Sequence, residues 1–80
     1  MTSDQVADAL ADSLAGLGIE AAAIGPDVRL REDLELDSTE MVQVSLDLTR
    51  RLGVRVRVDA KANGTFRDAC EAVTRQAGEP

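Results

Sequence analysis

The segment from Ser38 to Leu52 most tightly limits what this chain of 80 residues can fold into. Its large apolar side chains return at steps of three and four residues, which places them along one face of an α-helix. These side chains are Met41, Val44, Leu48 and Leu52, with Val42 and Leu46 at the edge of the same face. Ser45 is the one polar residue inside the apolar arc, and Gly53 is placed to end the helix. Because one apolar face must be buried against other elements, the segment predicts a helical bundle.

Two further segments have helical spacing. Residues 2–18 and residues 65–76 each align their apolar side chains on one face: Val6, Leu10, Leu14 and Leu17 in the first, and Phe66, Ala69, Cys70 and Val73 in the second. Thr2 and Gln5 have the spacing of a capping box, and Thr65 can cap the last helix. We therefore expect an all-α fold, a bundle of three to four helices with a long first loop, formed by a single domain over residues 1–80.

The connections between these helices also carry apolar residues. Residues 19–36 are long for a loop, but their apolar side chains can anchor them to the core, so we expect an ordered loop that can include a helical turn. In residues 54–58, the sequence VRVRV alternates as a strand would, but the chain offers no second strand to pair with it. We expect an extended linker pinned by its three valines, Val54, Val56 and Val58. Residues 59–64, DAKANG, can form a short turn of helix.

Composition argues against several classes of function. The chain has 15 acidic and 9 basic residues, a formal net charge of −6, and its short arginine run at residues 50–57 is more simply explained by a helix C-terminus than by a nucleic-acid surface. Apolar runs long enough to cross a bilayer and a signal-peptide pattern are both missing. The single cysteine, Cys70, suits a reducing compartment and is expected in the core. We expect a cytoplasmic monomer that binds neither nucleic acid nor membrane.

Ser38 lies among four carboxylates but has no base to activate it. The chain contains no histidine, and nothing places Lys61, the one lysine, near this serine. A nucleophilic serine needs such a base, so we expect no catalytic residues and no enzyme activity.

The same carboxylates partly match a calcium-binding loop. Asp33, Glu35 and Asp37 have the spacing of its first three ligands. The match then fails, because Ser38 stands where glycine is required and Val44 where the last glutamate is required. We therefore expect no dedicated metal site.

The residues around Ser38 predict a capped helix start. Asp37 followed by Glu40 three residues later is a capping-box arrangement, which stabilises a helix by about 1 kcal/mol. Ser38 is then the first helical residue, exposed beside free backbone N–H groups. An anion attached to its hydroxyl would meet the positive end of the helix macrodipole.

At these residues the chain resembles the acyl carrier proteins, a family that includes the peptidyl carrier domains. The shared pattern consists of Asp33-Leu34, Asp37-Ser38, Val42, Val44, Leu46, Leu48, Leu52 and Gly53-Val54. In that family a separate transferase attaches 4′-phosphopantetheine to the serine, and the thiol of this arm carries acyl intermediates as thioesters. The resemblance implies that Ser38 is the attachment site. It also implies three kinds of partner: a phosphopantetheinyl transferase, an acyl-loading enzyme, and a ketosynthase or other acyl-processing enzyme.

The pattern departs from the family at several positions. Thr39 replaces the usual leucine after the serine, and Glu35 stands where glycine is frequent. The resemblance assigns partner docking to Thr39, Glu40, Val42, Gln43, Leu46 and Asp47, although Val42 and Leu46 are equally compatible with the core. Carriers for fatty-acid enzymes line this helix with acids, whereas this chain has Gln43, Thr49, Arg50 and Arg51. This difference favours polyketide or other natural-product biosynthesis.

Two other interpretations stay open. The chain could be an aminoacyl or peptidyl carrier of nonribosomal-type assembly, which differs from an acyl carrier in the enzyme that loads it. It could also be an acidic helical interaction module without a prosthetic group, in which case Ser38→Ala would leave its biology intact.

Overall fold

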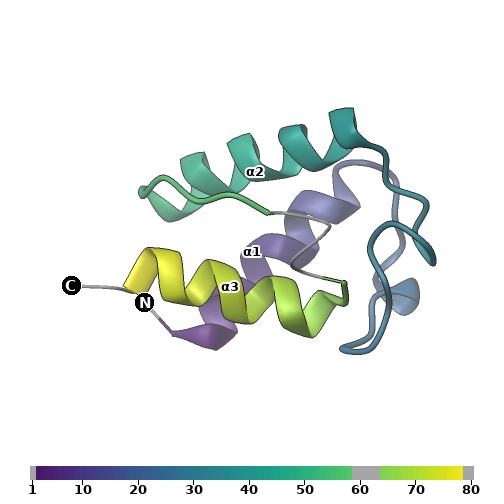
Figure 1. Cartoon of the computed structure of the whole chain (residues 1–80), viewed down its shortest axis with the longest axis horizontal. Coiled ribbons are helices and arrows are strands. Elements are labelled where there is room, and N and C mark those ends of the chain that lie inside the picture. Colours follow the sequence, from purple (N-terminus) through teal and green to yellow (C-terminus); the bar gives the residue numbers. More distant parts are fainter. Residues whose placement is uncertain (1, 59–63, 79–80) are drawn as a thin grey trace.

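The computed structural model describes residues 2–58 and 64–78, which form three α-helices and one short 3₁₀ helix (Figure 1). The elements are α1 (Ser3–Ala15), η1 (Ala21–Ala23), α2 (Ser38–Leu52) and α3 (Phe66–Gly78). α1 packs against both α2 and α3. The only β pairing among the described residues is an isolated antiparallel bridge between Arg29 and Thr65. The expected all-α bundle with a long first loop is confirmed.

Local capping fixes where each helix begins. Thr2 and Gln5 form a capping box at α1, with distances of 3.2 Å from Gln5 N to Thr2 Oγ1 and 2.9 Å from Thr2 N to Gln5 Oε1. At α3, the Asp68 N–H donates to Thr65 Oγ1 at 3.1 Å. α2 ends at Gly53, whose φ of 74° lies in the left-handed region that glycine adopts without strain. The helix starts expected from the sequence are therefore present.

The core is aliphatic, because the chain offers one aromatic side chain and Phe66 is only partly buried. The buried residues are Val6, Leu10, Leu14, Leu30, Leu36, Met41, Val44, Leu48, Val56, Val58, Ala69, Cys70 and Val73. Burial of each large aliphatic side chain contributes about 1.5–3 kcal/mol. Burial also raises the pKa of the Cys70 thiol to about 11, with a smaller contribution from Glu71, so the thiol stays protonated at neutral pH.

The long first loop is ordered by attachment to the start of α3. Its backbone forms three hydrogen bonds there: Leu30 N to Gly64 O at 3.1 Å, Phe66 N to Val28 O at 2.8 Å, and Arg67 N to Pro26 O at 3.0 Å. Leu30 and Leu36 enter the core, and η1 supplies the expected helical turn. The loop therefore brings the chain to the start of α2 along a fixed path.

Residues 54–58 run back from the end of α2 and are tied to both neighbouring helices. On one side, Ser45 Oγ accepts from Val58 N at 2.9 Å and Thr49 Oγ1 accepts from Val56 N at 3.1 Å. On the other side, the side chain of Gln76 pairs with the backbone of Arg57, at 2.7 Å to its N and 2.9 Å to its O. The extended linker expected here is present.

The anchoring of this linker differs from the expectation at one residue. Val56 and Val58 are buried, but Val54 remains 37% exposed. The chain is still bending away from the C-terminus of α2 at Val54, so the alternation of inward side chains starts only after it. The helical turn expected for residues 59–64 lies outside the described residues, apart from Gly64. None of the described helices has both the length and the apolar content that a membrane crossing needs.

Candidate functional site

Ser38 is the first residue of α2 and lies exposed at its N-terminal tip. Asp37 and Glu40 close a capping box around it: Glu40 N donates to Asp37 Oδ1 at 2.8 Å, and Asp37 N donates to Glu40 Oε1 at 3.1 Å. The hydrogen bonds of the cap do not involve the Ser38 hydroxyl. The cap therefore fixes the helix tip and leaves this hydroxyl accessible to another molecule.

The carboxylate of Asp33 stabilises the loop rather than the helix start. Asp33 Oδ2 accepts from the backbone N–H of Arg29 at 2.8 Å, and Asp33 N donates back to Arg29 O at 2.9 Å. The carboxylates near Ser38 thus serve separate local structures. Within residues 2–58 and 64–78, the structure contains no group of three or more metal-ligating side chains positioned to hold an ion.

The approach to α2 passes through a strained residue. Glu35 has a φ of 56°, in the left-handed region that L-residues adopt at a cost of about 1–2 kcal/mol. The next residue, Leu36, is buried, and its N–H donates to Leu30 O at 3.2 Å. Glycine, which is frequent at this position in the family that the sequence resembles, would adopt this backbone geometry without strain.

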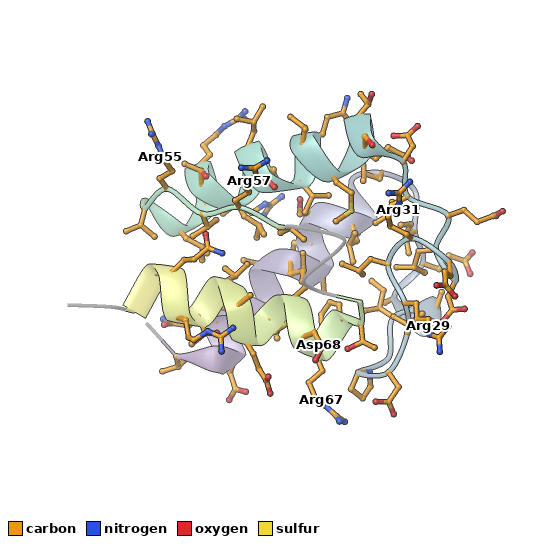
Figure 2. All side chains as sticks on the ribbon, in the orientation of Figure 1. Arg29, Arg31, Arg55, Arg57, Arg67 and Asp68 are labelled. Carbon is orange, nitrogen blue, oxygen red and sulfur yellow. The ribbon has the colours of Figure 1, made fainter. Side chains whose placement is uncertain are left out.

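A groove of about 750 Å³ opens beside Ser38 and follows α2. Ser38, Met41, Val42, Ser45, Leu46 and Thr49 line it from the helix, and Arg31, Arg55, Val56, Arg57 and Val58 line it from the loop and the extended segment. Its volume is in the range of small-molecule sites. Figure 2 shows Arg31 near the start of α2, with Arg57 and Arg55 further along the helix, and all three residues line the groove.

The outer face of α2 carries exposed apolar side chains. Val42 is 57% exposed and Leu46 is 61% exposed, so neither belongs to the core. Thr39 and Gln43 are also exposed on this helix. The structure therefore resolves the ambiguity of Val42 and Leu46 in favour of a surface location.

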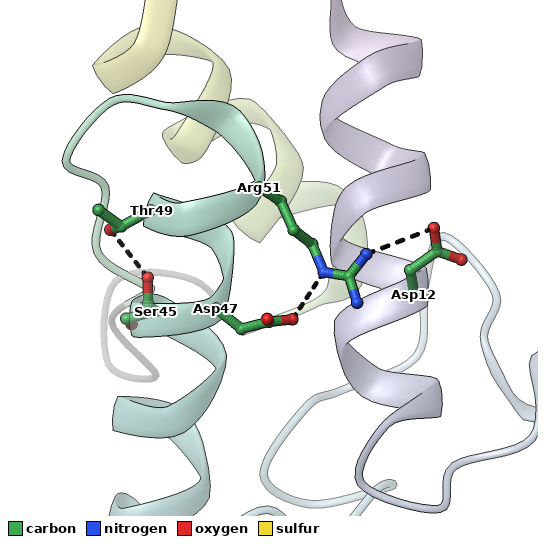
Figure 3. A network of polar contacts seen from close by, with 5 residues as sticks. All are labelled: Asp12, Ser45, Asp47, Thr49 and Arg51. Atoms are coloured by element: carbon green, nitrogen blue, oxygen red, sulfur yellow. Dashed lines mark hydrogen bonds and ion pairs between the residues drawn. The ribbon is translucent and has the colours of Figure 1, made fainter.

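The Asp47 side chain is mostly covered by other residues of the protein and is only partly exposed to solvent. Its Oδ2 is 2.7 Å from Arg51 Nε, and Arg51 Nη1 is 3.9 Å from Asp12 Oδ2 on α1 (Figure 3). The hydrogen bond from Arg51, assisted by the hydroxyl of Ser13, lowers the pKa of Asp47. Arg51 therefore links α2 to α1, and the Asp47 carboxylate that it binds is less available to a partner than Val42 or Leu46.

Two features of the site could not be recognised from the sequence. One is the group of three arginines that line the groove, which come from the loop and from the extended segment. The other is the role of Ser45 and Thr49, whose hydroxyls hold that segment against α2. The only sequence signal was the polar Ser45 within an otherwise apolar arc.

The comparison with known families identifies the class. The family model described as "phosphopantetheine attachment site" matches residues 5–73. The chain therefore belongs to this family and is a carrier protein of the acyl carrier protein type, in which 4′-phosphopantetheine is bound covalently to a serine. A comparison with curated proteins found no match. The exposed hydroxyl at a helix N-terminus, with an arginine-lined groove beside it, fits such an anionic arm.

Proposed function

We propose that this protein is an acyl carrier protein whose arm is attached to Ser38. The family match spans three serines, and only Ser38 is exposed. Ser13, on α1, is only 5% exposed. Ser45 is half buried, and its hydroxyl donates to Met41 O and accepts from Val58 N. A modifying enzyme must reach the hydroxyl that it esterifies, so the exposure of Ser38 carries the proposal.

The electrostatics at Ser38 support the same assignment. A phosphodiester there would lie at the positive end of the α2 macrodipole, next to unpaired backbone N–H groups. Arg31 lines the groove that begins at this point and adds a positive side chain. When bound, the arm supplies a terminal thiol that holds an acyl group as a thioester. The protein's own residues expose the hydroxyl, fix the helix tip and present a docking surface, so we propose a non-catalytic role.

The docking surface that we propose extends from Ser38 along the exposed side of α2. Val42 and Leu46 follow Ser38 at intervals of four residues and offer apolar contacts. Thr39, Glu40 and Gln43 would form its polar part, with Asp47 at its margin because Arg51 already binds that carboxylate. We propose that the phosphopantetheinyl transferase, the loading enzyme and a ketosynthase or other acyl-processing enzyme use this surface.

The charges on this surface favour a specialised pathway. α2 presents Gln43 and Arg50 to solvent, whereas carriers of fatty-acid synthesis tend to present acids there. We propose that the protein serves polyketide or other natural-product biosynthesis. Growth of a fatty-acid carrier deletion strain supported by this chain would contradict the assignment to a dedicated pathway. Loading by an amino-acid-activating enzyme, in place of an acyl-loading enzyme, would instead identify a peptidyl carrier.

The attachment is tested by incubating the protein with coenzyme A and a broad-specificity phosphopantetheinyl transferase, followed by intact-mass measurement. The wild type and Ser3→Ala should each gain the mass of one arm, since Ser3 lies outside the matched residues. Ser38→Ala should gain none while retaining its helical circular dichroism. A wild type that folds but never gains the arm would support an interaction module instead.

A further inference from the structure

We infer that the groove beside Ser38 binds the protein's own loaded arm and is selective for short acyl groups that end in a carboxylate. The inference rests on the proposed function, because the arm must be attached at Ser38. It adds the chemical class of the cargo and assigns a role to three arginines.

The groove has the composition of a site for a molecule with an apolar body and a negative end. Met41, Val42 and Leu46 supply apolar surface along α2. The polar groups of Ser45 and Thr49 are already engaged with the backbone of the helix and of the extended segment. The guanidinium groups of the lining arginines are therefore the main polar groups left to bind a ligand.

The charged residues that line the groove, within the part of the chain that the structure describes, are all arginines. Arg31, Arg55 and Arg57 contribute to the lining, and no carboxylate of residues 2–58 or 64–78 does, although the protein has a net charge of −6. The ion pairs between described residues use Arg29, Arg51 and Arg67 instead. Three arginines without a described acidic partner, gathered in one groove of an acidic protein, are complementary to an anionic ligand.

The arginines are placed at successive levels along α2. Ser45 binds the backbone of Val58 and Thr49 binds that of Val56, so the segment runs antiparallel to the helix. Arg57 therefore lies between these two levels, and Arg55 lies beyond Thr49. Figure 2 shows this order, from Arg31 near the start of the helix to Arg55 near its end.

The length of the groove matches the length of the arm. Ser38 and Thr49 are separated by eleven residues of helix, which is about 16 Å. The arm has about as many backbone bonds as five amino-acid residues and extends to roughly 17 Å. An arm that follows the groove would bring its thiol to the level of Thr49. A short acyl group would then reach Arg55, whose guanidinium can bind a carboxylate through two parallel hydrogen bonds.

The position of Ser38 favours the protein's own arm, rather than an acidic segment of a partner protein, as the ligand of the groove. Ser38, the proposed attachment residue, is itself part of its lining, so the arm is held at high local concentration. Arg31 is then placed for the phosphodiester, Arg57 for the amide carbonyls of the arm, and Arg55 for the cargo carboxylate.

The test compares two cargoes of similar size on the intact protein. A transferase would load wild type from succinyl- and butyryl-coenzyme A, with the succinyl carboxylate labelled with ¹³C, and its pKa would be measured by NMR titration. On the wild type we expect a pKa lower by about half a unit than on free succinyl-pantetheine, since an open groove lowers it less than a buried pair would. The amide signals of residues 55–58 should shift with succinyl but not with butyryl cargo.

Two variants distinguish binding of the cargo carboxylate in the groove from a general effect of the protein's charge on its pKa. Arg55→Gln should return the succinyl pKa toward that of free succinyl-pantetheine and remove the succinyl-specific amide shifts. Arg75→Gln removes the same charge from an exposed position of α3 outside the groove and should change neither. Equal pKa values on wild type and Arg55→Gln, or identical amide shifts for both cargoes, would overturn the inference while leaving the arm on Ser38. Failure of the mass to rise on loading would overturn the proposed function and the inference together.

Discussion

The backbone at the start of α2 provides most of the environment that an anionic group on the Ser38 hydroxyl requires. The capping box of Asp37 and Glu40 fixes the first turn of α2, and the free N–H groups of that turn face any anion on the serine. The residue needs neither a base nor a pocket of its own, because a separate enzyme performs the modification. The backbone strain in this region lies at Glu35, which adopts a left-handed conformation.

This strain predicts that Glu35→Gly stabilises the protein. Glycine adopts a φ of 56° without the steric clash of a Cβ atom, which costs about 1–2 kcal/mol in other residues. Part of the gain is offset by the greater freedom of glycine in the unfolded chain. We expect the free energy of unfolding in urea to rise by about 0.5–1 kcal/mol.

Glu35→Ala is the control, because it removes the same charge but keeps the Cβ atom. It should show no comparable gain. If glycine proves less stable than alanine at this position, the backbone at residue 35 is not strained in the way that its φ indicates.

At the scale of the element, α2 shows both the success and the limit of sequence patterns. Its bounds at Ser38 and Leu52 follow from a capping box at one end and Gly53 at the other, and the structure has both. Helix periodicity does not decide whether Val42 and Leu46 are buried, because both lie at the edge of the apolar arc. Their exposure depends on where the extended segment packs, and helix periodicity holds no information about that.

The packing of that segment predicts a large effect of Thr49→Val. Valine has nearly the shape of threonine but cannot accept the hydrogen bond from the N–H of Val56, a residue that is 4% exposed. A buried unpaired donor costs about 1–3 kcal/mol. Urea unfolding should show a loss of this size, and the Val56 amide should exchange faster with deuterium.

Thr74→Val on α3 provides a matched control. The Thr74 hydroxyl donates to Cys70 O at 2.6 Å within its own helix, and no hydrogen bond from the extended segment reaches it among the described residues. Its loss should leave the free energy of unfolding nearly unchanged. Equal losses for the two variants would show that Thr49 does not hold the segment.

At the scale of the whole molecule, the sequence predicted the bundle but not the groove. Helix periodicity, caps and turn residues are local, so three helices and an ordered loop could be inferred before their packing was known. The groove joins Arg31 from the loop to Arg55 and Arg57 from beyond α2, and only the tertiary structure brings them together. Val54 was wrongly expected to anchor the linker, because period-two alternation does not show where a bend ends.

The ion pair between Asp47 and Arg51 on α2 predicts a loss of stability in acid. Arg51 holds the pKa of Asp47 below its ordinary value, so this carboxylate stabilises the fold above its unfolded pKa and loses that contribution as the pH falls through its folded pKa. Asp47→Asn should be less stable than wild type at pH 7 by no more than about 1 kcal/mol, with the difference closing toward about pH 2.

Asp8→Asn is the comparison, since Asp8 is exposed on α1 and takes part in none of the ion pairs between described residues. Its difference from wild type should stay small across the same range. Urea unfolding at each pH gives both curves. A difference between Asp47→Asn and wild type that stays constant down to pH 2 would show that this ion pair does not contribute to the acid response.

The central claim is tested most directly by finding which serine receives the arm in the loading reaction. Trypsin cleaves after Arg31 and Arg50 and releases one peptide that holds both Ser38 and Ser45, so fragmentation of this peptide in the mass spectrometer distinguishes them. We predict that the added mass lies on Ser38 alone. An arm found on Ser45 or Ser13, or a fully folded protein that accepts none, would contradict the account.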